Sequence, residues 1–399
     1  MHLRFYLKKF AFLDSLNSYF KTYFHEYKAE RTTKYYLRQA EFKQLKPLSK
    51  TELTMAFRKH LSLRKIQPKL KSKGDLHIFL AFALNNWESV LPVALKAFGQ
   101  VTVFEWRSLG FDDRSSQWLK YRDSMNAQML QAFKKAHSEQ PIDAVVGYLA
   151  GYYIDPTILC AMAEMGAVIF NFCWDDKLNF PGKIIGGRYS STAAIASAVD
   201  LNLTNSPESV IRYFVHGGLA MFWPEAAHPH IHKPYDLPFE YDVTFVGGKY
   251  GWRPKFIAKL QRMGIKVSCF GNGWGNGSLS DEELIKLYSR SRINLGFAGV
   301  GYSKNLMCLK GRDFEVPMSG GLYLTQNNPE LHFVYEVGKE ILTYEDEFDC
   351  AKKIKWLLEH PEKGEQIRQM GRMRALRDHT WARRFHEIFR MSNLLQNDV

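Results

Sequence analysis

The sequence contains no apolar run long enough to span a membrane. Its longest runs, at 78–84 and 144–149, are far shorter than the roughly 20 residues that a membrane-spanning helix needs. Charged residues interrupt the N-terminus from Arg4 onward, so the apolar core of a cleavable signal peptide is missing as well. Internal repeats and low-complexity tracts are also absent. These absences predict a globular protein without a membrane-spanning anchor.

Cysteine is scarce and shows no pairing pattern. The five cysteines are odd in number, widely separated and without a CxxC pair; they are Cys160, Cys173, Cys269, Cys308 and Cys350. This pattern argues against a disulfide framework and against a zinc site. We therefore expect reduced thiols in a cytoplasmic protein.

The chain carries a net charge of +13, and all of it lies in the first 74 residues. Residues 1–74 hold 18 of the 54 Lys and Arg residues but only 5 of the 41 acidic ones, which leaves 36 of each sign for residues 75–399. The function of the basic segment therefore has to be inferred separately from that of the neutral remainder.

Aromatic residues recur at helical spacing within this basic segment. Tyr19, Tyr23 and Tyr27 lie four apart, as do Phe20 and Phe24, with lysines and arginines between them. This spacing predicts an amphipathic helical extension with an aromatic face and a basic rim. Two interpretations stay open. Either the aromatics dock on the rest of the protein, or the extension binds an anionic surface such as a membrane, nucleic acid or another polyanionic polymer.

From residue 75 onward, short apolar runs alternate with longer amphipathic segments. Strands are predicted at 75–84, 101–106, 142–149, 167–172 and 201–204, and helices at 88–98, 115–137, 156–165, 190–198 and 207–213. Such alternation is typical of a doubly wound parallel sheet. Residues 75–216 are therefore predicted to form one Rossmann-like domain.

Prolines interrupt this alternation between residues 217 and 240. His228, His230 and His232 lie in the same segment, but no cluster of Cys or carboxylates joins them, so an interdomain linker is favoured over a metal site. A second alternation of strands and helices fills 241–380, and a C-terminal helix at 381–399 is expected to cross back onto the first domain. The predicted fold class is α/β, with two Rossmann-like domains facing a central cleft and a basic helical extension at 1–74.

Three segments of the second half contain clustered glycines, and two of them also carry cations or a carboxylate. Glycines let a backbone approach phosphates, and cations offset the phosphate charge. The second segment, GNGWGNG at 271–277, lacks the GxGxxG spacing of a dinucleotide-binding turn, so a plain glycine turn is its structural alternative. For the third, CLKGRDFEVPMSGGLYL at 308–324, the alternative is a local ion pair that caps a helix. The candidate residues are Gly247, Gly248 and Arg253; Gly271, Asn272, Gly273 and Trp274; and Lys310, Arg312, Glu315, Gly320 and Gly321.

Five motifs follow one another in the second half. They are DVTFVGG (242–248), FGNGW (270–274), LYSRSRINLGF (287–297), GRDFEVPMSGGLYLT (311–325) and MGRMRALRDHTWARRF (370–385). In order and spacing, these motifs resemble the donor-binding domain of GT-B glycosyltransferases, in particular the CgeB-like group within the glycosyl transferases group 1 family. The first half resembles that family only in its alternation of strands and helices.

The resemblance implies a site for a nucleotide-sugar donor. Glu315 occupies the position of the carboxylate that accepts hydrogen bonds from the donor ribose, and Lys310, Arg312 and Arg253 would face the diphosphate. GT-B enzymes typically need no metal, and the nucleotide sugar is a substrate, so no metal and no cofactor is expected.

Two further features follow from the same resemblance. Tyr288 or Trp274 would pack against the base or the sugar of the donor. Retaining enzymes of this type carry a second Glu eight positions before Glu315, where this chain has Met307. Because that carboxylate is missing, neither retention nor inversion is assigned.

The first half is expected to supply the acceptor side and the general base. Asp175 and Asp176 directly follow the strand that ends at Phe172, at the end of a parallel sheet where ligands bind. Adjacent carboxylates point in different directions, so only one of the two is expected to reach an acceptor hydroxyl. Glu88 is an alternative base, and a role in capping the loop is the structural alternative for the aspartates.

The sequence therefore predicts a hexosyltransferase-type glycosyltransferase that moves a sugar from a nucleotide-sugar donor to a hydroxyl acceptor, which is a glycan, a lipid-linked molecule or another polymer. A nucleotide-sugar epimerase on the same fold is an alternative. Another is a nucleic-acid-binding protein, including a glycosyltransferase that modifies DNA. The expected location is the cytoplasm, with peripheral attachment to the inner face of the membrane through residues 1–74.

Overall fold

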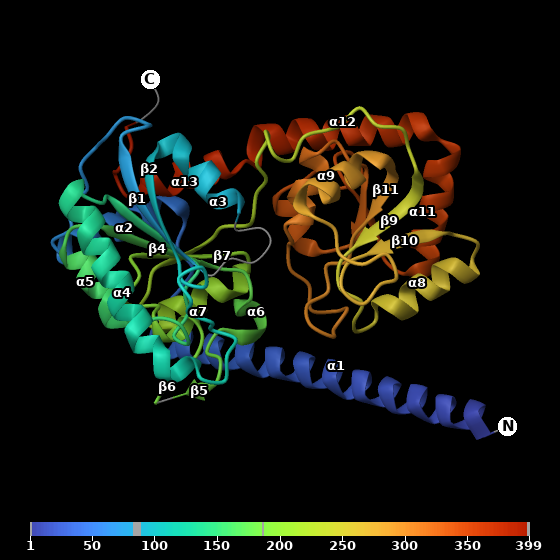
Figure 1. Ribbon diagram of the computed structural model, residues 1–399, viewed down its shortest axis with the longest axis horizontal. Coiled ribbons are helices and arrows are strands. Elements are labelled where there is room, and N and C mark those ends of the chain that lie inside the picture. Colours follow the sequence, from blue (N-terminus) through green and yellow to red (C-terminus); the bar gives the residue numbers. More distant parts are fainter. Residues whose placement is uncertain (1, 83–88, 186, 397–399) are drawn as a thin grey trace. The chain divides into compact units, whose positions relative to one another are not determined.

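The computed structural model describes residues 2–82, 89–185 and 187–396 and divides into two compact units (Figure 1). The N-terminal unit holds Thr32–Pro224 and the residues from Trp381 onward. The C-terminal unit holds Glu225–Thr380 and the residues up to Arg31. Helix α1 (His2–Phe42) contributes residues to both units.

The N-terminal unit is built on a six-stranded sheet in which every strand runs parallel to its neighbours. The strand order is β2-β1-β3-β4-β7-β8. All residues of β1 and β4 are buried, as expected for strands of a parallel sheet that is covered on both faces. The bounds are β1 (Leu76–Phe82), β2 (Gly99–Glu105), β3 (Ala144–Gly147), β4 (Val168–Cys173), β7 (Leu201–Thr204) and β8 (Ala220–Phe222), with a separate antiparallel pair β5 (Ile184–Ile185) and β6 (Arg188–Tyr189).

Helix α13 (Trp381–Met391), near the C-terminal end, packs in this unit. The ring of its Phe389 lies 5.3 Å from that of Phe98 and 5.8 Å from that of Phe170 in β4, measured between centroids. The remaining helices are α2 (Lys50–Leu63), α3 (Val90–Leu95), α4 (Trp118–Glu139), α5 (Pro156–Glu164), α6 (Asp176–Asn179) and α7 (Val210–Val215), with 3-10 turns at Lys96–Phe98, Thr192–Ala194 and Pro207–Ser209.

A buried aspartate joins α2 to the sheet. Asp200 is fully buried and accepts a hydrogen bond of 2.7 Å from the backbone N–H of Ile169 in β4. Its other oxygen pairs with His60 and Arg64 at the end of α2. Because α2 also buries Leu53, Phe57 and Leu61, this part of the basic N-terminal segment is an integral part of the unit.

The C-terminal unit has a five-stranded parallel sheet of order β10-β9-β11-β12-β13. Its strands are β9 (Tyr241–Val246), β10 (Val267–Phe270), β11 (Ser291–Leu295), β12 (Tyr323–Gln326) and β13 (Leu342–Tyr344). Its helices are α8 (Arg253–Arg262), α9 (Asp281–Arg290), α10 (Arg312–Met318), α11 (Glu347–Glu359) and α12 (Pro361–Asp378), with a 3-10 turn at Pro329–Phe333.

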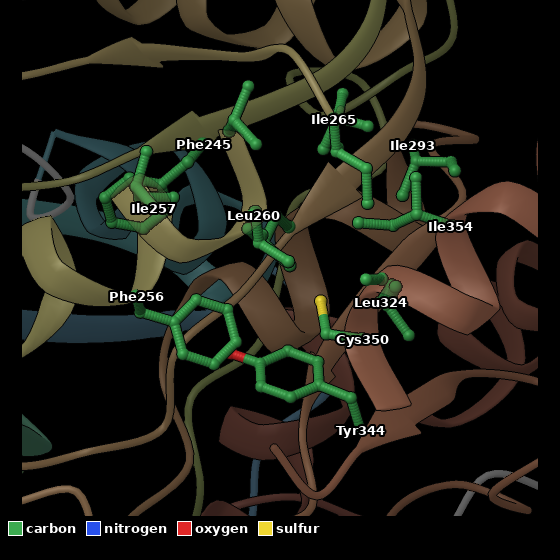
Figure 2. Packing of buried hydrophobic residues seen from close by; sticks show 14 of the residues in the cluster. Phe245, Phe256, Ile257, Leu260, Ile265, Ile293, Leu324, Tyr344, Cys350 and Ile354 are labelled. Carbon is green, nitrogen blue, oxygen red and sulfur yellow. The ribbon is translucent and has the colours of Figure 1, made fainter. Parts of the chain in front are cut away.

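The core of the C-terminal unit lies between its sheet and helices α8 and α11. Figure 2 shows Tyr344 against Phe256, with Cys350, Ile354 and Leu324 beside them. The rings of Tyr344 and Phe256 lie 5.2 Å apart, and the Tyr344 hydroxyl donates a hydrogen bond of 2.7 Å to the carbonyl of Gly296. This core fixes the loop after β11, which leads toward the candidate site.

The predicted alternation of strands and helices is present in both units. Two segments were predicted wrongly. Residues 220–222 belong to the sixth strand of the N-terminal sheet and not to the interdomain linker, and the predicted helix at 190–198 is only a 3-10 turn at Thr192–Ala194. A strand of three residues is too short to show a period. Among the described residues, no helix is both long and apolar enough to cross a membrane.

We predict that Asp200→Ala lowers the free energy of unfolding by about 3 kcal/mol, because it leaves a buried N–H and the Arg64 guanidinium without their acceptor. Urea-induced unfolding of the variant and the parent measures the change. Asp123→Ala, at a side chain that is 83% exposed, is the matched control and should cost less than about 0.5 kcal/mol. Equal decreases in the free energy of unfolding for the two variants would contradict the structural role of Asp200.

Candidate functional site

Three loops of the C-terminal unit begin at the carboxyl ends of neighbouring parallel strands. They follow β9, β10 and β11, which pair with one another in the order β10-β9-β11. Parallel strands bring their carboxyl ends to one edge of the sheet, where open α/β sheets bind ligands. The candidate donor residues lie on these loops and on the helices that follow them.

Arg253 is the first residue of α8 and is held in an aromatic pocket. Its guanidinium lies 4.3 Å from the centre of the Tyr250 ring and donates a hydrogen bond of 3.2 Å to the carbonyl of Gly248. The side chain is 5% exposed. Burial and the nearby positive charge of Arg312 lower the pKa of Arg253. Two guanidinium groups whose charges act on each other favour binding of a nearby anion.

Asp313 fixes the start of α10. Its Oδ2 accepts a hydrogen bond of 2.7 Å from the backbone N–H of Lys310, and its side chain is buried. Burial raises the pKa of Asp313 to about 6, against the opposing effect of that hydrogen bond and of the Arg312 charge. Among the described residues, no ion pair joins Arg312 to Glu315, and no side-chain hydrogen bond caps α10 at Gly311.

Arg312 and Glu315 lie in the first turn of α10 and keep part of their surface accessible. Although burial lowers the pKa of Arg312, Tyr288, Tyr323 and Glu315 raise it above its ordinary value. Lys310 is held differently, because its Nζ lies 3.0 Å from the sulfur of Cys308. The structure therefore brings Arg253, Arg312 and Glu315 into one region of the unit.

Tyr288 is less accessible than the stacking role requires, whereas Trp274 keeps part of its surface accessible. Tyr288 is 1% exposed, so no face of its ring can stack on a ligand, although burial and the charge of Glu315 raise the pKa of its hydroxyl. The indole N–H of Trp274 donates a hydrogen bond of 2.8 Å to the carbonyl of Gly247. Trp274 thereby ties the loops after β9 and β10 to each other.

The glycine loop at 271–277 is held by its own backbone. Gly271 donates to the carbonyl of Gly277 at 2.6 Å, and the carbonyl of Asn272 accepts from Lys249 at 2.9 Å. A Cβ on Gly271 would stand 2.6 Å from the carbonyl oxygen of Gly247. The close approach of two loops explains these glycines, and Gly273 with a φ of +84° supplies the left-handed turn.

Gly320 and Gly321 also have local structural reasons. Gly320 follows α10 with a φ of +71°, as at many helix ends. A Cβ on Gly321 would stand 2.7 Å from Val316 and 2.9 Å from Asn294. Neither glycine needs a ligand to explain it.

Glu225 is a candidate site residue that the sequence did not reveal. It lies in the segment interpreted as a linker, yet a Cβ on Gly311 would stand 2.7 Å from Oε2 of Glu225 and 2.9 Å from Oε1 of Glu315. Burial and the charge of Glu315 raise the pKa of Glu225 well above its usual range. No sequence signal marks this position, because the contact joins residues far apart in the chain.

The acceptor-side candidates lie in the N-terminal unit. Asp176 is fully buried and accepts hydrogen bonds from Thr204 at 3.0 Å and Tyr213 at 2.8 Å, and burial raises its pKa to about 6. Asp175 is exposed and accepts a hydrogen bond of 2.9 Å from the hydroxyl of Tyr148. Of the two, only Asp175 can reach a ligand. Glu88, the alternative base, lies outside the described residues.

No metal site is formed by the part of the chain that the structure describes. Groups of three or more His, Cys, Asp or Glu side chains with suitable geometry are absent there. His232 is buried, and its Nδ1 accepts a hydrogen bond of 3.0 Å from the backbone N–H of His228. These histidines thus stabilise the segment after β8.

Comparison with known proteins agrees with this architecture. A family model described as glycosyl transferase-like matches residues 253–390, and no curated protein sequence matches the chain significantly. Among solved structures, sucrose-phosphate synthase from Thermosynechococcus elongatus is 13% identical, with a TM-score of 0.55 over 79% of this chain and 98% of that one.

Two further solved structures are similar. An alpha-glucosyltransferase in complex with UDP is 10% identical, with a TM-score of 0.56 over 80% of this chain and 100% of that one. HepE of Anabaena in complex with UDP-glucose is 11% identical, with a TM-score of 0.54 over 79% and 99%. At these identities the likeness establishes the fold. It confirms the prediction of two Rossmann-like domains of the GT-B type.

We predict that Asp313→Asn changes how stability depends on pH. The pKa of Asp313 is higher in the folded protein than in the unfolded chain, so ionisation opposes folding and wild-type stability falls as pH rises from about 4 to about 6. Asn cannot ionise but still accepts a hydrogen bond. Relative to the variant, the wild type should lose about 3 kcal/mol of unfolding free energy across this range. Denaturant unfolding at each pH measures the difference.

The matched control is Asp242→Asn, because the side chain of Asp242 is 64% exposed. The difference between this variant and the wild type should hardly vary with pH. If the Asp313→Asn difference were equally constant, Asp313 would not be a buried, proton-binding residue at the start of α10.

Proposed function

We propose that this protein is a glycosyltransferase that moves a sugar from a nucleotide-sugar donor to a hydroxyl acceptor. The observation that carries the proposal is the convergence of Arg253, Arg312 and Glu315 in the C-terminal unit. Guanidinium groups bind diphosphates, and a carboxylate binds vicinal hydroxyls. Solved proteins of the same fold bind UDP and UDP-glucose, which supports a donor of this class.

In this proposal, the nucleoside diphosphate leaves the anomeric carbon as the acceptor oxygen attacks it. Arg253 and Arg312 offset the negative charge that develops on the leaving group, and Lys310 adds a third cation to the same segment. Asp175 is the proposed general base, because its exposed carboxylate can accept the proton of a hydroxyl. The chemistry is proposed to need no metal. The relation to the CgeB-like group is part of the proposal.

Part of α1 supports a second proposal, attachment to an anionic membrane surface at the cytoplasmic face. Phe20, Tyr23 and Phe24 are 63%, 61% and 62% exposed, and Tyr27 is 47% exposed. They recur at helical spacing, so they share one face of α1. Aromatic side chains next to Lys21 and Arg31 match the composition of helices that lie in the membrane interface.

The opposite side of this stretch of α1 contacts the rest of the C-terminal unit. The Thr22 hydroxyl donates a hydrogen bond of 2.9 Å to the carbonyl of Tyr302, and Glu26 accepts one of 3.0 Å from Asn305. The Lys21 ammonium lies 4.9 Å from the centre of the Tyr302 ring. Polar residues thus hold the helix, while its aromatic face stays accessible. This arrangement favours lipid over the docking of the aromatics on the protein.

For the donor site, we predict that Glu315→Ala and Arg312→Ala each weaken binding of UDP-glucose at least tenfold, through loss of charge-assisted hydrogen bonds worth about 1.5–3 kcal/mol. Thermal unfolding with UDP-, GDP-, ADP- and TDP-linked sugars identifies the donor, since a ligand at a hundred times its Kd stabilises by about 2.7 kcal/mol. Glu336→Ala, at an exposed residue paired with Lys339, is the control. If no nucleotide sugar stabilises the wild type, the proposed function is wrong.

For the membrane surface, we predict that the double variant Phe20→Ser and Phe24→Ser loses most binding to vesicles that contain phosphatidylserine, because each buried Phe contributes about 2 kcal/mol. Vesicle flotation at low and high salt measures it, and salt should weaken the wild type through screening of the basic residues. Phe348→Ser, at a side chain that is 70% exposed in α11, is the control. Binding to duplex DNA but not to vesicles would contradict the proposal.

A further inference from the structure

Glu225 and Glu315 approach the same face of Gly311 from different parts of the chain. Glu315 lies on α10, and Glu225 precedes β9 in the segment after β8. Their nearest oxygens stand 2.7 and 2.9 Å from the position of a Cβ on Gly311. The two oxygens are therefore at most about 6 Å apart, and the structure records no direct hydrogen bond between these described side chains. Both residues keep part of their surface accessible.

The two carboxyl groups differ in the charge that their surroundings favour. Burial and the negative charge of Glu315 raise the pKa of Glu225, and Asp313 adds to the effect, while Lys310 and Arg312 oppose it. The net shift is well above the usual range, so Glu225 holds its proton under conditions where an ordinary glutamate has lost it. A protonated carboxyl group donates one hydrogen bond, whereas an ionised one only accepts.

We propose that Glu225 is a second carboxyl group of the donor site and that, together with Glu315, it binds one hydroxyl group of the nucleotide sugar. The hydroxyl donates its hydrogen to Glu315 and accepts a hydrogen bond from the protonated Glu225. A hydroxyl oxygen at about 2.7 Å from each carboxyl oxygen is compatible with their separation. This inference rests on the proposed function and adds a residue that orients the donor.

Gly311 gives the proposal its steric basis. Gly311 has a φ of −49°, which any residue adopts, so its backbone does not require glycine. A methyl group there would meet the ends of both carboxyl side chains and displace them. Glycine at this position thus keeps the approach to Glu225 and Glu315 open. Met307, which lacks a carboxyl group, offers no alternative second acid.

The first test compares two substitutions of Glu225. Glu225→Gln keeps a neutral donor and should bind UDP-glucose within about threefold of the wild type, whereas Glu225→Ala should bind about tenfold more weakly. Isothermal calorimetry with UDP and with UDP-glucose measures both. Equal weakening for the two ligands assigns the hydroxyl to the ribose, and weakening for UDP-glucose alone assigns it to the sugar. Unchanged affinity of Glu225→Ala for both ligands would overturn the inference.

The second test is the pH profile of binding. When pH rises through the raised pKa of Glu225, the wild type loses the donated hydrogen bond and gains a second negative charge, so its affinity should fall. Glu225→Gln cannot ionise and should not show this decline. Identical profiles for the two proteins would show that Glu225 does not act through its proton.

The third test uses Gly311→Ala, which needs no change of backbone conformation. Its melting temperature should stay within a few degrees of the wild type, and its affinity for UDP-glucose should fall at least tenfold, because the methyl group displaces the carboxyl ends. For the Glu225 variants, Glu362→Gln at an exposed residue of α12 is the control for removal of a carboxylate. If the wild type binds the donor and both Gly311→Ala and Glu225→Ala bind it equally well, this inference fails while the proposed function stands. If the wild type binds no nucleotide, the proposed function itself fails.

Discussion

The hydrogen bond from the backbone of Lys310 to Asp313 is the constraint on which the candidate site depends. It is 2.7 Å long and buried, so breaking it would leave a polar group without a partner away from water. Because it sets the first turn of α10, it also sets the positions of Arg312 and Glu315. The same bond explains how the Asp313 carboxyl group is accommodated so deep in the unit. Burial disfavours its ionised form and raises its pKa, and the hydrogen bond that holds the start of the helix offsets part of this effect.

Glycine serves two different purposes around this site. In the loops after β9 and β10, the two backbones lie so close that a Cβ on Gly271 would stand 2.6 Å from the carbonyl oxygen of Gly247. Trp274 joins the same loops through its indole N–H. At Gly311, by contrast, the backbone conformation is one that any residue adopts, and a Cβ would meet two carboxyl oxygens instead of backbone atoms. Glycines that pack against backbone explain the fold, whereas a glycine that keeps carboxyl groups accessible points to a ligand.

The basic N-terminal segment divides into parts with different physical roles. Arg64 and Lys71 form ion pairs with Asp200 and Asp143 of the N-terminal unit, so much of the segment stabilises the fold. The stretch from Phe20 to Tyr27 keeps exposed aromatics. An excess of positive charge in a sequence therefore does not by itself indicate a binding surface. Exposed apolar area beside the charge is what distinguishes such a surface.

The sequence by itself determined the α/β class, both alternations of strands and helices, and the stretch 308–324 as the place of the cations and the carboxylate. These features depend on local periods and on neighbouring residues. Only the tertiary structure decided which side chains are accessible. It buried Tyr288 and Asp176, left Asp175 exposed, made β8 a sixth strand, and brought Glu225 to Glu315. The reason is physical, since burial and the proximity of distant segments arise from packing, and a pKa depends on both.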